Sequence, residues 1–346
     1  MVLDRLACRI QSGVEASPLG PSWPARPYRW RNLGAPTATR TLASHAYDPI
    51  VRPWPQKTRE IAQYVVDSAR WNGFAFRDDD IVIATWAKTG TTLTQQVVGQ
   101  LIFKGDPEIF GMAHSPWIDS RLIPNAQQQA EAQTHRRFLK THLPVDALVF
   151  SPKARYIYVG RDARDVCWSW YHHQVNFTPE TYDTLNAFPG RAGPPIARPG
   201  GDIRAYYHAW LDNDGWPAPS FWANVQGWWD IRRLPNVLLV HFARLKADLP
   251  AEIRRIGAFL DVPIDEALLP AMVEHCGLEH MRRQAAAFER LKHRFKGGGA
   301  TFINKGTNER WRDVLSPAEI AKCDAIAAER LTPDCARWLA TGALPD

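Results

Sequence analysis

The sequence predicts an α/β fold in which a central, mostly parallel sheet is flanked by helices. Two observations support this prediction. Four short, β-rich apolar runs are spaced along the chain, and helical patterns lie between and after them. Polar residues suited to a binding site follow the runs, as is typical of buried parallel strands that end at a site. Alternation of strands and helices favours a mostly parallel sheet.

The predicted elements follow in chain order. The strands are residues 80–86 (DIVIATW), 136–142 (RRFLKTH), 155–160 (RYIYVG) and 236–242 (NVLLVHF). One helix is expected over 91–105, which opens with threonines and closes at a glycine. Another is expected over 250–262, where apolar residues recur on one face. In such sheets, ligands bind beyond the carboxyl ends of the strands, where the loops enter the helices.

Residues 177–202 are expected to form a long irregular loop because they are rich in proline and glycine. Five tryptophans follow this segment: Trp210, Trp216, Trp222, Trp228 and Trp229. A long loop beside aromatic residues favours a lid or a pocket wall. The alternative is that the tryptophans pack a helical layer against the sheet, and the sequence leaves both interpretations open.

The composition limits the domain organisation and the partners. The chain has 346 residues, of which 45% are hydrophobic, enough for one large domain or two small ones with a buried core. Half of the net charge of +6 falls in the first fifty residues, where six arginines face three acidic residues. We therefore expect residues 1–52 to be a poorly ordered, basic, proline-rich extension and residues 53–346 to be the folded domain. Elsewhere the charge is nearly balanced, which argues against nucleic acid as a partner.

The cysteines and the hydropathy indicate a reducing compartment. Five scattered cysteines, none spaced as C-x-x-C, suggest neither a disulfide framework nor a zinc site. No apolar run approaches the roughly 18 residues of a membrane helix, and the N-terminus lacks the apolar core of a signal peptide. The sequence therefore predicts a cytoplasmic protein without a membrane partner.

The stretch ATWAKTGTTLTQQ, residues 84–96, resembles a phosphate-binding loop in an unusual order. Lys88 precedes Gly90, whereas the usual nucleotide-triphosphate loop has lysine after its second glycine. The amides at the start of the next helix would cradle a phosphate-like group, and Gly90 allows close approach. The lysine position, and the absence of an acidic residue at the other strand ends, argue against a magnesium-dependent kinase, so no metal is expected. Taken alone, the motif is equally consistent with an ordinary strand-to-helix turn.

Three further motifs carry basic or hydroxyl groups. Lys140 and His142 stand two residues apart at a strand end, so their side chains point to the same side. A histidine there can accept a proton near neutral pH, and an ammonium can stabilise negative charge. Arg161 follows a strand and Ser169 lies two helical turns further on, which suits a second phosphate. FINKGTNERW adds Lys305 in a late loop.

Together these motifs resemble those of the cytosolic-type sulfotransferases, in the same order, from about residue 54 to 335. WAKTGTT looks like the family's 5′-phosphosulfate loop, and LKTHLP looks like its catalytic histidine strand. YVGRDARDVCWSWYHH is similar to its 3′-phosphate motif, and FINKGTNERW to its late glycine loop. The resemblance implies a P-loop-like three-layer fold, a sulfotransferase domain over 53–346, the donor 3′-phosphoadenosine 5′-phosphosulfate (PAPS, product PAP), and no metal.

The resemblance also implies residue roles. His142 would take the proton from an acceptor hydroxyl during in-line attack on sulfur, while Lys88 and Lys140 would stabilise the charge that develops. Ser169 would help Arg161 hold the 3′-phosphate and would restrain Lys88. The implied donor-binding residues are Lys88, Thr89, Gly90, Thr91, Thr92, Leu93, Arg161, Ser169, Phe242, Phe288, Asn304, Lys305 and Gly306.

Three places depart from the family pattern. Leu93 stands where the family has a tryptophan over the adenine, so Phe242 and Phe288 are the aromatic candidates for that contact. Asn304 stands where arginine is usual, and Glu309–Arg310 stand where Gly-Asp is usual. The 3′-phosphate contact of this loop is then left to Lys305, the Gly306 amide and Arg310.

The acceptor is expected to be a small aromatic or otherwise hydrophobic molecule with a hydroxyl group. Phenols are favoured because their hydroxyl, with a pKa near 10, loses a proton more easily than an aliphatic one. Trp117, His142, Tyr171, His172 and the 177–230 region are expected to line its pocket. The sequence leaves open a phenol, steroid, amine, lipid or glycan acceptor, and also the oligomeric state. The alternative functions are an ATP- and magnesium-dependent phosphotransferase of related fold and a noncatalytic nucleotide-binding protein.

Overall fold

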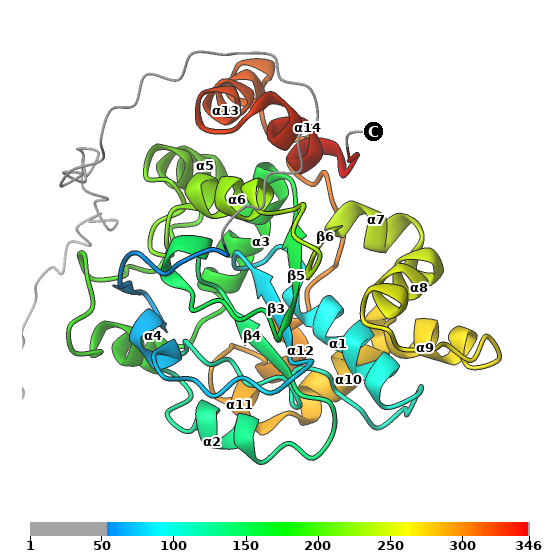
Figure 1. The fold of residues 1–346 in the computed structure, drawn as a ribbon. Coiled ribbons are helices and arrows are strands. Elements are labelled where there is room, and N and C mark those ends of the chain that lie inside the picture. The colour runs from blue at the N-terminus through cyan, green and yellow to red at the C-terminus, as the bar shows by residue number, and fades with distance from the viewer. Residues whose placement is uncertain (1–53, 345–346) are drawn as a thin grey trace, which may run out of the picture.

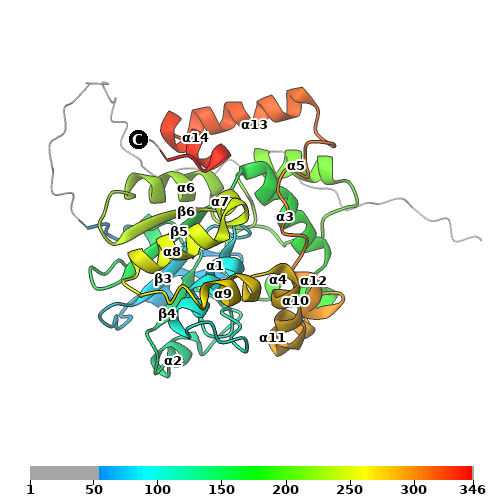
Figure 2. The same ribbon diagram turned by 90° about the vertical axis from the view of Figure 1, so that its right-hand side faces the viewer.

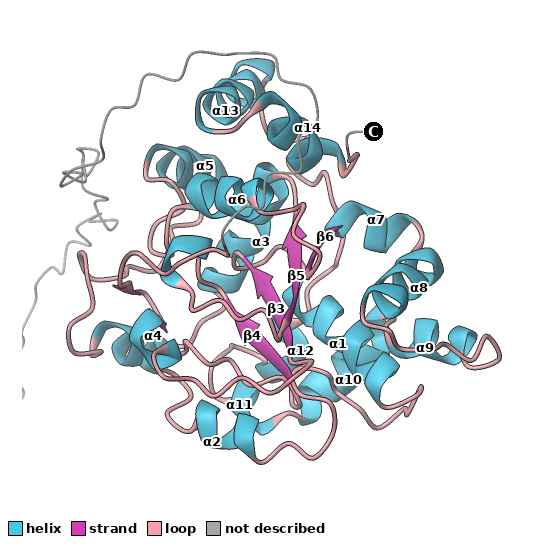
Figure 3. Cartoon of the chain, in the orientation of Figure 1, coloured by secondary structure: helices cyan, strands magenta, loops and turns pink. Residues whose placement is uncertain are grey.

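The computed structural model describes residues 54–344, and its centre is a four-stranded parallel sheet (Figures 1 and 3). The strands are β3 (Ile81–Thr85), β4 (Phe138–Thr141), β5 (Arg155–Gly160) and β6 (Val237–His241), in the order β4-β3-β5-β6. Ladders pair Ile81 with both Phe138 and Arg155, and Gly160 with His241, so the carboxyl ends of all four strands meet at one edge. All four predicted strands are confirmed.

The strands form because apolar side chains face both sides of the sheet. All five residues of β3 are buried. Ile81 and Ile83 join one hydrophobic cluster, whereas Val82 and Ala84 join the other, as the two-residue period of a strand requires. The sheet is therefore the middle of three layers.

Helices supply the two outer layers. On the Ile83 side lie α1 (Thr91–Ile102), α7 (Phe242–Ala247), α8 (Leu249–Phe259) and α9 (Leu269–His275). On the Val82 side lie α3 (Ala163–Val175), α5 (Ile203–Asp212), α6 (Phe221–Asp230) and α14 (Pro333–Thr341). The figures show α5 and α6 on the side of the sheet away from α8 and α9 (Figures 1 and 2). This arrangement confirms the predicted α/β fold and both predicted helices.

The remaining elements are short, apart from α13. They are β1 (Ala62–Gln63), β2 (Val66–Asp67), the 3₁₀ helices η1 (Ser68–Trp71) and η2 (Val145–Ala147), α2 (Ala126–Glu131), α4 (Pro179–Asn186), α10 (Leu278–Ala287), α11 (Glu289–Lys292), α12 (Gly298–Phe302) and α13 (Pro317–Arg330). The helices α10, α11 and α12 lie together below the carboxyl-terminal pair α13 and α14 in Figure 1. The predicted extension over residues 1–52 lies outside the described residues, and its boundary stays a prediction.

The prediction of an irregular loop over 177–202 is wrong for residues 179–186, which form α4. Thr178 caps this helix by accepting from the amide of Thr181, and Pro179 occupies the first turn, where its missing N–H costs nothing. A capping threonine followed by proline was the available signal. Residues 187–202 contain no helix or strand.

The tryptophans after this segment pack the core. Trp210, Trp222, Trp228 and Trp229 are buried among the helices on the Val82 side. Trp228 stacks on Tyr158 of β5, with ring centroids 5.2 Å apart and planes 9° apart. The interpretation that these residues pack a helical layer against the sheet is therefore the correct one.

The amino-terminal edge of the sheet holds a buried ion pair. The Arg137 side chain lies against Asp80, with Nε donating to Oδ1 at 2.7 Å, and both side chains are almost fully buried. Asp80 also accepts from the Arg77 amide at 2.9 Å. The pair fixes the starts of β3 and β4, at the opposite end of the strands from the predicted site. Within residues 54–344, no helix is both long and apolar enough to cross a bilayer.

Candidate active site

A cavity of about 280 Å³ opens at the carboxyl ends of the strands. Its walls include the loop after β3 with the start of α1, the end of β4, α3, the α10–α11 region with residues 294–295, and residues 302–307. Residues 64–66, 112–123, 177–185, 218–219 and 242–246 contribute further side chains. It is therefore where the sequence predicts a ligand site. Among the predicted site residues, the lining includes Lys88, Gly90, Thr91, Thr92, Leu93, Trp117, Lys140, His142, Arg161, Ser169, Phe242, Phe288, Asn304, Lys305 and Gly306.

Three predicted residues lie elsewhere. Thr89 is buried beneath the loop, where its hydroxyl donates to the carbonyl of Trp86 at 3.0 Å. Tyr171 points away from the cavity and donates to the carbonyl of Gly200 at 3.0 Å. His172 borders a small adjoining cavity and accepts from Arg310. The structure therefore does not bring Tyr171 or His172 into the main cavity.

The loop after β3 requires glycine at position 90. Gly90 has φ of 126°, and it is the N-cap of α1 without a side-chain cap. A Cβ at this position would lie 2.8 Å from Cδ2 of Phe242. Only glycine lets the backbone pass beneath that ring, which leaves the first amides of α1 available to an anion.

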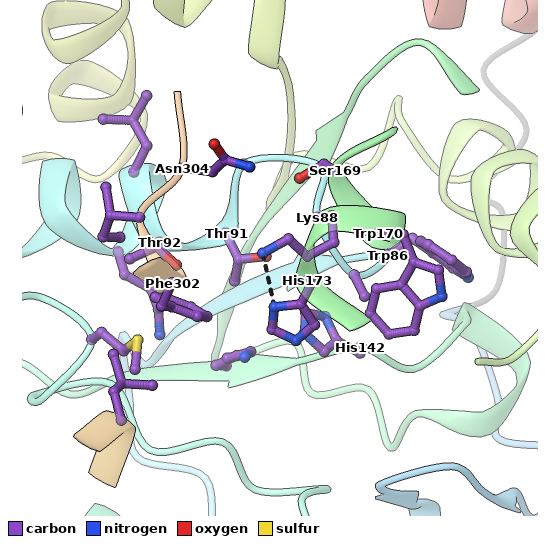
Figure 4. Close-up of a pocket in the computed structure, with 18 of the residues that line it drawn as sticks. Trp86, Lys88, Thr91, Thr92, His142, Ser169, Trp170, His173, Phe302 and Asn304 are labelled. Carbon is purple, nitrogen blue, oxygen red and sulfur yellow. Dashed lines mark hydrogen bonds between the residues drawn. The ribbon is translucent and has the colours of Figure 1, made fainter. Parts of the chain in front are cut away.

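The ammonium of Lys88 lies inside the cavity without a carboxylate partner in the described chain. Its Nζ lies 3.3 Å from Nδ1 of His173 and 4.9 Å from the ring centre of Phe302 (Figure 4). Burial, together with the charge of Arg161, lowers the Lys88 pKa to about 7. The hydrogen-bond partner of Lys88 is thus His173, one helical turn beyond Ser169.

His142 is arranged as a neutral base. Its Nδ1 lies 2.8 Å from the carbonyl oxygen of Thr85 and 2.9 Å from the hydroxyl oxygen of the same residue. The carbonyl can only accept, and the hydroxyl can accept while it donates to Thr91, so both contacts favour a proton on Nδ1 and a lone pair on Nε2. Burial and the charges of Lys140 and Lys88 hold the His142 pKa well below its usual range. The ring of Trp117 packs edge-on against it, with centroids 4.7 Å apart.

Lys140 lies over the face of Trp117, with Nζ 3.8 Å from the ring centre. Burial lowers the Lys140 pKa to about 7, and the nearby Asp119 opposes this shift. Asp119 is fully buried and accepts from the indole of Trp117 at 2.8 Å and from the amide of His142 at 3.2 Å. One carboxylate therefore positions both the aromatic platform of Lys140 and the backbone of His142.

Arg161 joins two loops that are far apart in the sequence. Its guanidinium donates to the carbonyl of Lys88 at 3.2 Å, to the carbonyl of Thr307 at 3.1 Å and to the Asn308 side chain at 3.1 Å. The same group lies 4.2 Å from the ring centre of Phe242. Burial lowers the Arg161 pKa to about 10, which leaves the group charged at neutral pH.

Sequence reasoning missed several lining residues. His173 was passed over in favour of His172, although its position four residues after Ser169 places it on the same helical face. Phe302 opens the FINKGTNERW motif, but only Asn304, Lys305 and Gly306 of that motif are predicted site residues. Arg290 and Arg294 belong to no recognised motif, and their sequence context, AAAFERLKHRFKGGG, is typical of an ordinary charged surface helix.

The charge of the lining fits a polyanionic ligand. The basic side chains on the cavity wall are Lys88, Lys140, Arg161, Lys246, Arg290, Arg294, Lys305 and Arg310, whereas Asp165 is the one carboxylate on the described wall. Such an excess of positive charge on one cavity wall favours an anion with several charged groups. No group of three or more His, Cys, Asp or Glu side chains in the described chain is arranged to hold a metal ion.

Comparison with known proteins agrees with this chemistry. A family model described as a sulfotransferase domain matches residues 78–333. A glycolipid sulfotransferase of Mycobacterium bovis (strain BCG / Pasteur 1173P2) is 29% identical over 308 residues, which cover 80% of this chain and 93% of the relative. A luciferin sulfotransferase of Photinus pyralis is 28% identical over 284 residues, covering 72% of this chain and 71% of the relative.

The fold is shared with solved structures. A retinol dehydratase in complex with retinol and PAP aligns with a TM-score of 0.62 at 20% identity, covering 78% of this chain and 88% of that chain. This likeness confirms the three-layer fold that the sequence predicts.

Proposed function

The chain belongs to the sulfotransferase domain family, and on this premise we propose that it moves the sulfuryl group of PAPS to a hydroxyl of a small, hydrophobic or aromatic acceptor. The observation that carries the proposal is the convergence of His142, Lys88 and Lys140 on one wall of a cation-lined cavity. A neutral base and two ammonium groups are what sulfuryl transfer to a hydroxyl requires.

The donor-binding residues are proposed from the cavity lining. Lys88 and the amides of residues 90–92 would hold the 5′ end, where Gly90 permits close approach. Arg161, Ser169 and Lys305 would hold the 3′-phosphate. Phe242 and Phe288 are on the wall and are the candidates for contact with the adenine. When bound, the donor supplies an activated sulfuryl group on a phosphate leaving group.

The acceptor hydroxyl would lie against Nε2 of His142. That nitrogen takes the proton as the oxygen forms its bond to sulfur, while the Thr85 carbonyl holds the ring in the required tautomer. Lys140 would face the sulfuryl oxygens and Lys88 the oxygen that leaves, so each ammonium meets negative charge where it grows. His173 orients the Lys88 ammonium and needs no contact with either substrate.

The acceptor class is proposed from the far wall, which is largely apolar. Tyr64, Trp86, Trp117, Leu122 and Phe295 are among the residues on it. Two relatives whose names specify a glycolipid and luciferin as acceptors support a hydrophobic acceptor. The cytoplasmic location and the independence of metal that the sequence predicts belong to this proposal.

Ligand-dependent melting tests the donor. PAP at about 100 times its dissociation constant should stabilise the protein by roughly 2.7 kcal/mol. AMP, ADP and ATP should stabilise it less, with or without magnesium, because they lack the 3′-phosphate. Stabilisation by ATP with magnesium alone would overturn the proposal in favour of a phosphotransferase.

A further inference from the structure

Resting on the proposed function, we infer that the acceptor carries an anionic group, such as a carboxylate, in addition to its hydroxyl. Arg290 and Arg294 are the residues that would bind this group. They stand one helical turn apart at the end of the cavity formed by α11 and the residues after it. We name this pair the arginine subsite.

Neither arginine has an acidic partner among residues 54–344. Arg290 lies over the ring of Phe288, with its guanidinium carbon 4.9 Å from the ring centre. Arg294 donates to the carbonyl of Leu122 at 3.3 Å. Burial lowers the pKa of each group, and the charge of Arg290 lowers the pKa of Arg294 further. Two partly buried like charges without a carboxylate partner are stabilised by an anion between them.

The backbone around the subsite is held rigidly. The carbonyl of Arg294 accepts from the amide of Thr178 at 3.1 Å and from the Thr181 hydroxyl at 3.0 Å, which ties it to α4. Tyr64 lines the same part of the cavity, and the charge of Arg294 acts on its phenol. Tyr64 has φ of 54° because it begins the two-residue turn between β1 and β2, where Gln63 pairs with Val66. The backbone that carries Arg294 is therefore held in place by hydrogen bonds from a distant part of the chain.

The subsite lies close to the reacting groups and away from the residues proposed to hold the donor's anionic groups. The charges of Arg290 and Arg294 both lower the pKa of Lys140, the residue two positions before His142. The residues proposed for the donor's anionic groups come from the β3–α1 loop, Arg161, α3 and residues 304–306, whereas the subsite shares its wall with Leu122 and Tyr64. Phe288, a candidate for contact with the adenine, lies beneath Arg290 and is the point where the two regions meet. One acceptor molecule can therefore present its hydroxyl to His142 and its anion to the arginines.

Matched acceptor pairs test the inference. The probes are 4-hydroxyphenyl alkanoic acids with side chains of increasing length and their primary amides, which keep the shape and remove the charge. With PAP bound, the best acid should bind the wild-type protein about tenfold to a hundredfold more tightly than its amide, since hydrogen bonds to a charged group carry this much affinity. With PAPS, kcat/KM should show the same preference.

The variant Arg290→Gln/Arg294→Gln should reduce the acid-to-amide ratio to about one, because glutamine keeps a polar side chain without the charge. Lys292→Gln, on the exposed side of α11, is the matched control and should keep the wild-type ratio. Melting with PAP is measured for every protein, which verifies folding and donor binding.

Three outcomes overturn the inference or its premise, and they are distinguishable. If the wild-type protein binds every acid no more tightly than the matching amide, the arginine subsite is wrong. Stabilisation of the same protein by PAP would still support the proposed function. A preference for the acid that survives the double substitution assigns the anion to other residues and equally overturns the inference. Absence of PAP stabilisation in the wild-type protein removes the proposed function, whereas the acid-to-amide binding ratio, measured without PAP, still decides the subsite.

Discussion

The Nζ of Lys88 lies 3.3 Å from Nδ1 of His173, and this contact joins the loop after β3 to α3. Burial and the charges of Lys88 and Lys140 hold the His173 pKa well below its usual range, so the ring is neutral and accepts a hydrogen bond from the ammonium. The ring also stacks on Trp170, with centroids 5.6 Å apart. A packed imidazole therefore sets the direction of a cation that no carboxylate within residues 54–344 neutralises.

The two active-site lysines predict the pH dependence of donor use. Their pKa values are lowered to about 7, so both ammonium groups lose protons in the free enzyme as the pH rises through neutrality. Since kcat/KM reports the free enzyme, kcat/KM for PAPS should fall above about pH 7. His142 stays neutral down to pH 6.5, so no decline is expected between pH 7 and 6.5. A profile that rises from pH 7 to 9 would contradict this account.

The substitution His173→Leu should shift the fall in kcat/KM for PAPS, expected above about pH 7, to lower pH. Leucine removes an acceptor that stabilises the charged form of Lys88, and a hydrogen bond to a charged group corresponds to about 1–2 pH units. The measurement is kcat/KM for PAPS across pH. His172→Leu is the control, because His172 is hydrogen-bonded to Arg310 rather than to Lys88. In this variant kcat/KM should fall at the same pH as in the wild type. If kcat/KM of His173→Leu falls at the same pH as that of the wild type, the contact has no electrostatic effect on Lys88.

His142→Ala should lower kcat by about 10²–10⁴, the usual contribution of a general base. Donor affinity should be nearly unchanged, because the proposed donor contacts come from Lys88, the amides of residues 90–92, Arg161, Ser169 and Lys305 and not from the His142 ring. PAP-induced melting shifts provide that readout. His293→Ala, on the exposed surface, should match the wild type in both assays. Wild-type turnover in His142→Ala would remove this histidine from the mechanism.

Gly90→Ala should abolish donor binding and destabilise the protein by about 1–3 kcal/mol. The new methyl group would lie 2.8 Å from Phe242, at a φ of 126° that alanine tolerates poorly. Thermal unfolding with and without PAP gives both effects. Gly200→Ala meets open space and should retain the PAP response. Donor binding of normal strength in Gly90→Ala would place the anion away from this loop.

Asp80→Ala should destabilise the protein by about 3–5 kcal/mol, because Arg137 would remain buried without its partner. Denaturant unfolding measures this loss. Asp78→Ala removes an exposed ion pair with Lys153 and should cost at most about 1 kcal/mol. Turnover by the folded Asp80→Ala protein at low temperature should be normal, since the pair lies at the far end of the strands. An equal effect of both substitutions would show that burial of the pair is unimportant.

The sequence predicted those parts of the fold that depend on local patterns. Apolar runs identify the strands, and polar residues immediately after them identify Lys88, Lys140, His142 and Arg161. These side chains meet because parallel strands end at the same edge.

The rest depends on helix rotation and long-range packing. A rotation of about 100° separates His172 from His173, so adjacent histidines face different surroundings. Arg290 and Arg294 reach the cavity because Thr178 and Thr181 hold the chain there, more than a hundred residues away in sequence. No periodicity within one segment contains that information.

The segment 302–308 contacts two of the side chains proposed to bind the donor. Phe302 lies against the Lys88 ammonium, and the Thr307 carbonyl accepts from Arg161. A displacement of this one segment would therefore disturb the proposed 5′ and 3′ contacts of the donor together, although Lys88 and Arg161 come from different loops.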